Sequence, residues 1–410
     1  MEGAGYSNLD GGSRWLEKEQ ARSRKSRMVV IGSIAGVAAL IVAGIVIGVL
    51  VSKHHSSSST SSSSSSKSSS SSGSSGKADP STGFFAVVNQ KDPNDPSTFE
   101  PDSALSNAFY GVAYTPFGSQ IPDCGSNLPA VIEDIQLISQ ITTRLRLYGA
   151  DCNQSSLVLD AIQRTKVNMS VWLGNYVLPG DDAGYTRQRD EITTALKAFG
   201  TTNVAGITVG NEFMLNYLNA NGGNGDPNSA VGNQGAAILN SKIADTRSNL
   251  KSLGYDNIPV GTADAGAYFN NEVLAAVDYG MANVHPWFAN VSIDTASSWT
   301  TTFFQQTDIA AAQAQSNNPQ MYIAETGWPT FSNDVGNESN GPSNASVPNL
   351  QTFVNDFVCS SNTGGINYFF FEVFDEPWKN ATFGGVEGYW GIFNFNKTLK
   401  ALTLPTCSHS

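Results

Sequence analysis

From residue 105 onward, short apolar runs alternate with longer amphipathic stretches. In the amphipathic stretches the apolar residues recur at intervals of three and four, as in Val131, Ile135 and Ile138, which is the spacing of a helix packed on a core. The short runs between them are typical of buried strands. The pattern predicts eight strands, over residues 109–114, 143–147, 169–173, 206–209, 260–264, 282–285, 321–324 and 366–371. It predicts helices over residues 128–140, 187–199, 236–253 and 350–358.

Eight strands that alternate with helices predict an α/β fold, a (β/α)8 TIM barrel, for residues 105–410. A doubly wound sheet also alternates strands with helices, but it is expected to carry a glycine-rich phosphate loop after its first strand. Residues 110–118 contain no such loop. The barrel is therefore the preferred interpretation.

An apolar run precedes the barrel at residues 28–51, with Ser33 as its only polar side chain. This length suits a transmembrane helix, whereas the apolar part of a cleaved signal peptide is shorter and ends in small residues. Basic residues are more numerous before the run than after it, where Lys53 follows. The asymmetry predicts a cytoplasmic tail over residues 1–27 and an extracellular barrel, as in a single-pass type II protein of the plasma membrane.

Residues 52–104 are predicted to be a stalk that links this span to the barrel. Residues 56–76 are almost wholly serine, so they cannot bury a core and are expected to form a flexible spacer open to O-glycosylation. Residues 77–104 remain polar and contain prolines, so the linker is extended to residue 104.

The net charge of −12 argues against a nucleic-acid partner, because a chain that binds phosphates needs a basic face. Sequons for N-glycosylation support a secreted domain. Six are expected to be modified: Asn153, Asn290, Asn337, Asn344, Asn380 and Asn396. A seventh, Asn168, leads into a predicted barrel strand and is expected to be too buried for modification.

The chain has four cysteines, none in a CxxC pair or near a histidine at zinc-ligand spacing, so no metal site is expected. Cys124 and Cys152 fall in the loops after the first two predicted strands, on one face of the barrel. Cys359, after a helix, and Cys407, after the last helix, are expected on the opposite face. We therefore predict the disulfides Cys124–Cys152 and Cys359–Cys407.

Carboxylates and aromatic residues cluster where the predicted strands end, which is where such a barrel carries its active site. Glu212 follows the fourth strand and Glu325 the seventh, so the two stand almost opposite each other in an eight-strand ring. Glycoside cleavage needs two carboxyl groups that flank the scissile bond. A single strand-end acid is more often a helix cap or an ion-pair partner, but a pair in this arrangement favours catalysis.

Four motifs carry a family resemblance. They are Val209-Gly210-Asn211-Glu212, Ile323-Ala324-Glu325-Thr326-Gly327-Trp328-Pro329, His285-Pro286-Trp287-Phe288, and Phe374-Asp375-Glu376 with Lys379. In this order and spacing they resemble family 17 glycoside hydrolases, specifically the fungal cell-wall branch. The resemblance covers residues 105–407.

The resemblance implies a retaining β-1,3-glucanase that needs no metal or organic cofactor. It implies that Glu212 is the acid/base and Glu325 the nucleophile. It further implies a set of substrate-binding residues: Tyr114, Tyr148, Asn211, Trp287, Glu376 and Lys379. His285 is expected to be a hydrogen-bonding wall residue, Trp328 either a sugar platform or barrel packing, and Asp264 a subsite residue by position alone. Two alternatives stay open: a glucanosyltransferase, and a non-catalytic wall-glucan-binding protein.

Overall fold

The computed structural model describes residues 88–222 and 225–409. The predicted cytoplasmic tail, the predicted transmembrane span and residues 52–87 of the predicted stalk lie outside these ranges. Within them, no helix is both long enough and apolar enough to cross a membrane.

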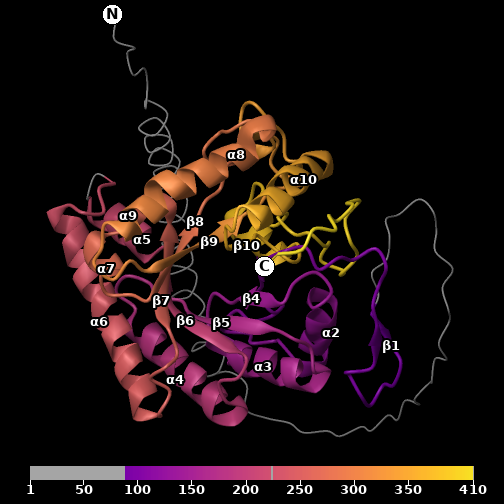
Figure 1. Ribbon diagram of the computed structural model, residues 1–410, viewed down its shortest axis with the longest axis horizontal. Coiled ribbons are helices and arrows are strands. Elements are labelled where there is room, and N and C mark those ends of the chain that lie inside the picture. The colour runs from indigo at the N-terminus through magenta and orange to yellow at the C-terminus, as the bar shows by residue number, and fades with distance from the viewer. Residues whose placement is uncertain (1–87, 223–224, 410) are drawn as a thin grey trace, which may run out of the picture. The chain divides into compact units, whose positions relative to one another are not determined.

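Eight parallel strands close into a barrel in the order β10-β3-β4-β5-β6-β7-β8-β9, and helices surround it (Figure 1). The strands are β3 (Gly111–Ala113), β4 (Arg144–Arg146), β5 (Ser170–Asn175), β6 (Val204–Asn211), β7 (Val260–Ala265), β8 (Tyr279–Asn283), β9 (Gln320–Thr326) and β10 (Tyr368–Phe370). The predicted (β/α)8 barrel is confirmed.

The helices are α2 (Leu128–Ile138), α3 (Gln154–Thr165), α4 (Asp182–Phe199), α5 (Phe213–Asn221), α6 (Ala230–Ser252), α7 (Asn271–Leu274), α8 (Ile293–Phe303), α9 (Ala310–Gln313), α10 (Val347–Thr363) and α11 (Pro377–Phe383). Short 3-10 turns are η1 (Asp151–Asn153), η2 (Gly266–Tyr268) and η4 (Val335–Asn337), and η3 (Phe304–Ile309) is π-helical. The four predicted helices are present. Helix α4 begins five residues earlier than predicted, at Asp182, because the side chain of Asp181 caps its first turn by accepting from the Gly184 amide.

One strand differs clearly from its predicted position, residues 282–285. Strand β8 begins at Tyr279 and ends at Asn283. The Tyr279 ring lies inside the barrel against Gly206 and Gly261, where any side chain would collide with it. The Tyr279 hydroxyl lies 2.9 Å from the Thr208 hydroxyl, so its polar end is satisfied within the core.

Residues 88–104, which the sequence assigns to the stalk, contain the antiparallel strands β1 (Asn89–Gln90) and β2 (Phe99–Glu100). This hairpin is bonded to α2. The Gln136 side-chain amide donates to Gln90 Oε1 and to the Pro96 carbonyl, each at 2.6 Å. The folded unit therefore extends N-terminal of residue 105.

Both predicted disulfides are present, Cys124–Cys152 and Cys359–Cys407. Cys359 lies within α10 rather than after a helix. The expectation for Asn168 is wrong, because this side chain is exposed just before β5. Modification of the six other sequons stays a prediction.

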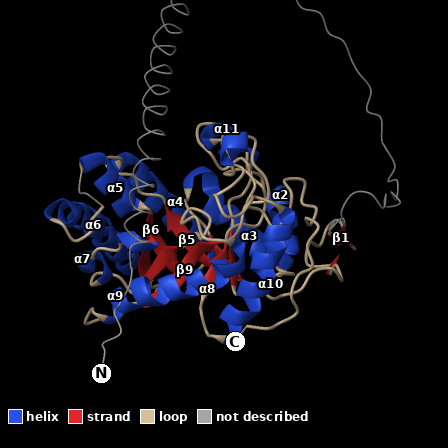
Figure 2. Ribbon diagram, turned by 90° about the horizontal axis from the view of Figure 1, so that it is seen from above, coloured by secondary structure: helices blue, strands red, loops and turns tan. Residues whose placement is uncertain are grey.

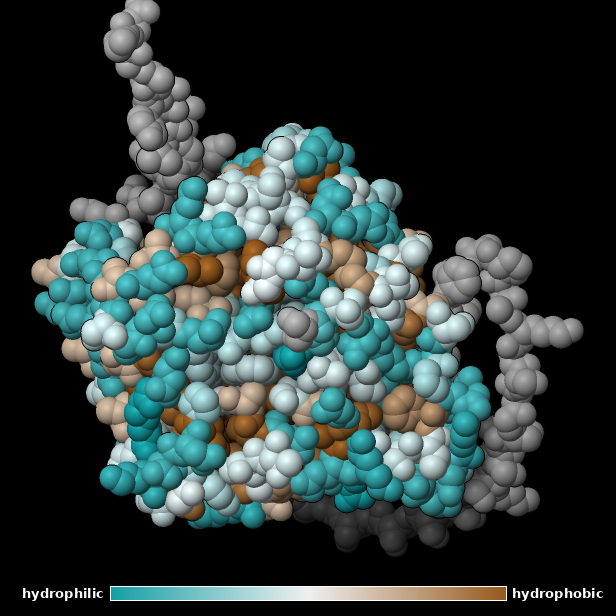
Figure 3. All heavy atoms as spheres, viewed as in Figure 1, coloured by the Kyte–Doolittle hydropathy of each residue, from teal (hydrophilic) through white to brown (hydrophobic). Residues whose placement is uncertain are grey.

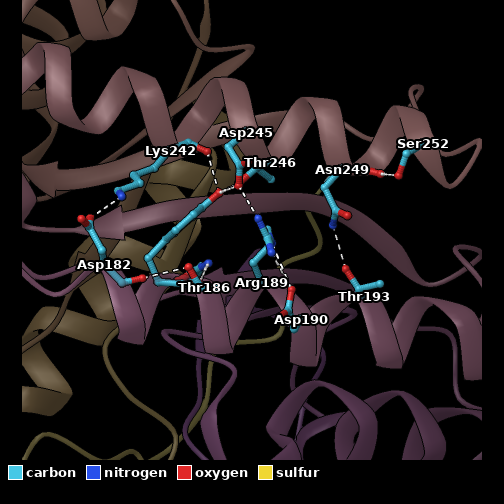
Figure 4. Close-up of polar contacts among 12 residues, drawn as sticks. Asp182, Thr186, Arg189, Asp190, Thr193, Lys242, Asp245, Thr246, Asn249 and Ser252 are labelled. Atoms are coloured by element: carbon cyan, nitrogen blue, oxygen red, sulfur yellow. Dashed lines mark hydrogen bonds and ion pairs between the residues drawn. The ribbon is translucent and has the colours of Figure 1, made fainter.

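Helices α4 and α6 lie side by side and are joined by polar contacts (Figure 4). Asp245 of α6 accepts from the Tyr185 hydroxyl and from Arg189 of α4, each at 2.7 Å. A cavity of about 10 Å³ lies between these helices and strands β5 and β6, and it is lined in part by Asn175 and Thr246. It has room for about one water molecule, so a sugar must bind elsewhere.

A buried acid in η3 makes the stability of the barrel depend on pH. Asp308 is 1% exposed, and within the described ranges neither of its carboxyl oxygens has a hydrogen-bond partner. Burial raises the pKa of Asp308 well above 3.8, so the folded state keeps a proton that the unfolded state releases. The stability contributed by the neutral acid is therefore present below pH 3.8 and is lost as the pH rises towards the folded-state pKa.

We expect Asp308→Asn to raise the free energy of unfolding at pH 7, because the amide has no proton to lose, and to flatten the decline of that free energy between pH 4 and pH 7. Thermal unfolding across this range measures the effect. The control is Asp190→Asn, which changes a carboxylate whose side chain is 63% exposed. Equal pH slopes in wild type and Asp308→Asn would contradict the assignment.

Candidate active site

The loops that follow the carboxyl ends of the strands gather around α11 at one end of the barrel, and the C-terminus lies at the other end (Figure 2). Four strands bring polar residues to the end near α11: Arg146 closes β4, Asn211 closes β6, Asn283 closes β8, and Glu325 is the next-to-last residue of β9. The barrel therefore brings together groups that are far apart in the sequence.

Glu325 is held as an ionised carboxylate by two donors. Arg146 Nη1 lies 2.8 Å from Glu325 Oε1, and His285 Nε2 lies 3.0 Å from Oε2. Burial on its own would raise the pKa of Glu325, but the hydrogen bond from His285 and the positive charge of Arg146 outweigh burial and lower this pKa to about 2. The carboxylate is thus charged at neutral and mildly acidic pH.

Glu212 follows β6 in a left-handed backbone conformation, with φ 56° and ψ 35°, at the N-terminus of α5. Few non-glycine residues adopt this conformation, and it is most often kept at functional sites. Its side chain accepts a hydrogen bond of 3.0 Å from the Asn283 amide. Asp264 supports the turn by accepting from the backbone amides of Met214 and Leu215, so Asp264 is a helix cap rather than a subsite residue.

Arg146 links the two strand ends that carry the glutamates. Its second terminal nitrogen donates to Asn211 Oδ1 at 2.6 Å, next to Glu212, while the first binds Glu325. Its guanidinium also lies 4.3 Å from the centre of the Tyr148 ring. Burial lowers the pKa of Arg146, but Tyr148 and the acids Glu325 and Glu212 raise it more, so the arginine remains charged.

Lys379 organises a second acidic cluster at the same end of the barrel. Its Nζ lies 2.6 Å from Glu372 Oε2 and 2.9 Å from Glu376 Oε2. Burial and the neighbouring charge of Glu376 raise the pKa of Glu372 well above its usual range, although Lys379 opposes this shift. Burial would lower the pKa of Lys379, but the two glutamates raise it above its ordinary value.

Tyr114, Trp287 and Trp328 are buried in packing positions, which for Trp328 is one of its two expected roles. Tyr114 is 1% exposed, and its hydroxyl donates to Asp134 of α2 at 2.7 Å. Trp287 and Trp328 are 1% and 0% exposed and pack edge to face, with ring centroids 5.3 Å apart. Trp328 also donates to the Asn344 carbonyl at 3.0 Å. These rings support the wall of the site, because neither indole presents a face to a ligand.

The other predicted residues meet at the site. Asn211, His285, Glu376 and Lys379 make the contacts described above, and Tyr148 is half-buried beside Arg146. Sequence reasoning missed the site roles of Arg146, Asn283 and Glu372. The site role of Arg146 could have been inferred from the sequence. An arginine inside a predicted barrel strand is unexpected unless a charged partner is buried with it.

The arrangement separates two carboxyl groups by environment. Glu325 has a cation and an imidazole as its partners, whereas Glu212 accepts from the neutral amide of Asn283. Paired carboxyls in unlike environments are what an acid and a nucleophile require. The site can therefore supply a stable anion and a second carboxyl for proton transfer to a bound glycoside.

We expect Arg146→Met to raise the pKa of Glu325 by at least about one unit, because the buried carboxylate then loses its positive partner. Titration of the Glu325 carboxyl carbon by NMR measures this value. Arg164→Met is the control, since Arg164 pairs with Asp160 on the surface of α3. An unchanged Glu325 pKa in Arg146→Met would show that the His285 bond suffices to hold the anion.

Comparison with known proteins places this geometry in a family. The model of the BtgE/BtgC glycoside hydrolase domain matches residues 111–391. The putative glucan endo-1,3-beta-glucosidase btgC of Aspergillus niger is 36% identical over 335 residues, which cover 77% of this chain and 46% of that protein. The chain thus spans about half the length of the curated relatives it matches.

Solved structures agree with the assignment. The family 17 β-1,3-glucanosyltransferase of Rhizomucor miehei is similar with a TM-score of 0.57 and 26% identity, over 72% of this chain and 97% of that chain. An active-site mutant of the same enzyme in complex with laminaritriose is similar with a TM-score of 0.58 and 25% identity, over 73% and 99% of the two chains. The chain therefore belongs to the BtgE/BtgC glycoside hydrolase domain family.

Proposed function

We propose that this protein is a retaining glycoside hydrolase that cleaves internal bonds of β-1,3-glucan, with Glu325 as nucleophile and Glu212 as acid/base. The observation that carries the proposal is the environment of Glu325. Its carboxylate is buried at the mouth of the barrel yet kept ionised by Arg146 and His285, and Glu212 directly follows β6 at the same end of the barrel. An ionised nucleophile and a separate proton donor are the two requirements of this reaction.

In the first step the glycosidic oxygen takes the proton of Glu212 as its bond to the anomeric carbon breaks. The Glu325 carboxylate forms a new bond to that carbon, which gives a covalent glucosyl-enzyme. In the second step Glu212 removes a proton from water, and the water oxygen displaces Glu325. Both carboxyl groups then regain their starting states, and the configuration of the sugar is retained.

Similar proteins support the choice of substrate. The btgC relatives are named as glucan endo-1,3-beta-glucosidases, and a related structure holds laminaritriose. The net charge of −12 is compatible with a neutral polysaccharide as the substrate. The btgC relatives are about twice as long as the part that this chain matches. The substrate is therefore proposed from the geometry of the site together with the activity for which these relatives are named.

We also propose that the barrel works outside the cell, on the cell wall, while the apolar run at residues 28–51 anchors it in the plasma membrane. The length of the run, the basic residues before it and the sequons on the barrel support this arrangement. An extracellular position is consistent with the two disulfides.

Chain transfer is the second candidate, because a family 17 structure that resembles this one is a glucanosyltransferase. The first step is the same in both reactions. They differ in whether water or a sugar hydroxyl displaces Glu325 in the second step. A binding protein without turnover is disfavoured, since both carboxyl groups and the buried partners of Glu325 are in place.

We expect Glu325→Gln and Glu212→Gln each to lower turnover of reduced laminari-oligosaccharides by at least about 100-fold. Separation of the products by size measures the rate. Glu272→Gln, on the exposed surface of α7, is the control. Products shorter than the substrate would establish hydrolysis, and longer ones would establish transfer. An unreactive wild type, or full activity in either site variant, would contradict the proposal.

A further inference from the structure

The large apolar side chains that stay exposed are concentrated at one end of the barrel. Among the described residues nine of them are at least 37% exposed: Phe117, Ile121, Tyr176, Leu178, Ile238, Phe331, Val335, Phe383 and Phe395. All except Ile238 lie in segments that follow the carboxyl ends of β3, β5, β9 and β10. This is the end that carries Glu212 and Glu325. At the end that carries the C-terminus, hydrophobic residues are interspersed with hydrophilic ones (Figure 3).

Five of these side chains are aromatic, and we call them the aromatic rim: Phe117, Tyr176, Phe331, Phe383 and Phe395. Four of the five are held by a second ring. Phe117 and Phe395 pack edge to face, with centroids 4.9 Å apart, although they are 64% and 46% exposed. Phe331 packs on Tyr389 at 5.0 Å, and Phe383 lies 6.2 Å from Trp378. The rings are thus fixed in place while much of their surface stays in water.

The aromatic rim lies on both sides of the carboxyl groups. Tyr176 follows β5, and Phe331 follows β9, which is four places away in the ring of eight strands. Tyr176 directly follows Asn175, the last residue of β5, so it stands at the same end of the barrel as Glu212 and Glu325. The aromatic rim therefore extends over the loops after β5, β9, β10 and β3, at the end of the barrel that carries both carboxyl groups.

Exposed apolar side chains that gather on one face mark a binding surface. The rim consists of separate rings or ring pairs on different loops, and such rings offer flat faces of the kind on which sugars stack. We propose that the aromatic rim is an extended platform for a linear neutral glucan, and that it holds sugar units beyond those bound at Glu212 and Glu325. The proposal rests on the proposed function, since that function supplies the polysaccharide.

The test compares two double variants of the full chain, Phe117→Ala with Phe395→Ala, and Phe331→Ala with Phe383→Ala. Ile238→Ala is the matched control, because Ile238 is 39% exposed on α6, away from the rim. Binding to insoluble β-1,3-glucan particles is measured by co-sedimentation in a Glu325→Gln background, so that the particles stay intact. Turnover of laminaritriose is measured in the same variants with Glu325 restored.

We expect each double variant to bind the particles at least about fivefold more weakly than its parent, while Ile238→Ala stays within about twofold. Turnover of laminaritriose should stay within about twofold of wild type, because a short substrate does not reach the rim. Unchanged particle binding in both double variants, or a parent that does not bind, would overturn the proposal. An equal loss of laminaritriose turnover would also overturn it.

The same measurements separate this proposal from the proposed function. If wild type does not cleave laminaritriose or the particles, the proposed function fails, and the binding comparison still decides whether the rim holds glucan.

Discussion

The ion pair between Arg146 and Glu325 is the interaction on which the rest of the site depends. The two side chains are 1% and 9% exposed and meet at 2.8 Å, so both charges are withdrawn from water. A buried charge that lost its partner would cost several kcal/mol, which forces every neighbouring group to complete the network. Asn211 Oδ1 accepts a hydrogen bond from the other terminal nitrogen of Arg146, and His285 donates one to the other oxygen of Glu325. Strands β4, β6 and β9 must therefore keep their register at this end of the barrel.

The surrounding structure stabilises this arrangement from two sides. Asp264 caps α5 and so supports the left-handed turn at Glu212. On the side of β10, Lys379 lies between Glu372 and Glu376 and compensates two acids that would otherwise repel Glu325. Lys400, from the C-terminal segment, binds Asp375 at 2.7 Å in the same loop. Polar pairs of this kind allow an acidic cluster to exist in a largely buried site.

The sequence predicted the barrel, most strand positions, both disulfides and the position of Glu212 and Glu325 at one end of the barrel, because each depends on local spacing or on the order of the strands. It failed where the outcome depends on contacts between distant segments. The inward position of the Tyr279 ring depends on Gly206 of β6 and Gly261 of β7. The spacing within one strand gives no information on these contacts with other strands. Tyr114 and Trp287 were predicted at the substrate, but partners such as Asp134 and Trp328 hold them in the packed wall. For Trp328 the structure shows the packing role, one of its two expected roles.

The exposed aromatic side chains illustrate the same limit from the other direction. A phenylalanine in a loop, such as Phe117 or Phe331, gives no indication in the sequence of whether it is buried under the loop or left in water. Only the closed order of the strands brings the loops after β3, β9 and β10 to one end and shows that their apolar side chains share a surface with the carboxyl groups.

The most direct test of the account is to trap the covalent intermediate with a 2-deoxy-2-fluoro glucosyl donor and to locate the label by mass spectrometry of peptides. The fluorine slows both steps, and a good leaving group makes formation faster than breakdown. The account predicts one glucosyl group per chain, on the peptide that contains Glu325, and none in Glu325→Gln. A label on Glu212, on Glu372 or on Glu376 would contradict the assignment of the nucleophile. Turnover with inversion of the sugar and without any label would contradict the mechanism itself.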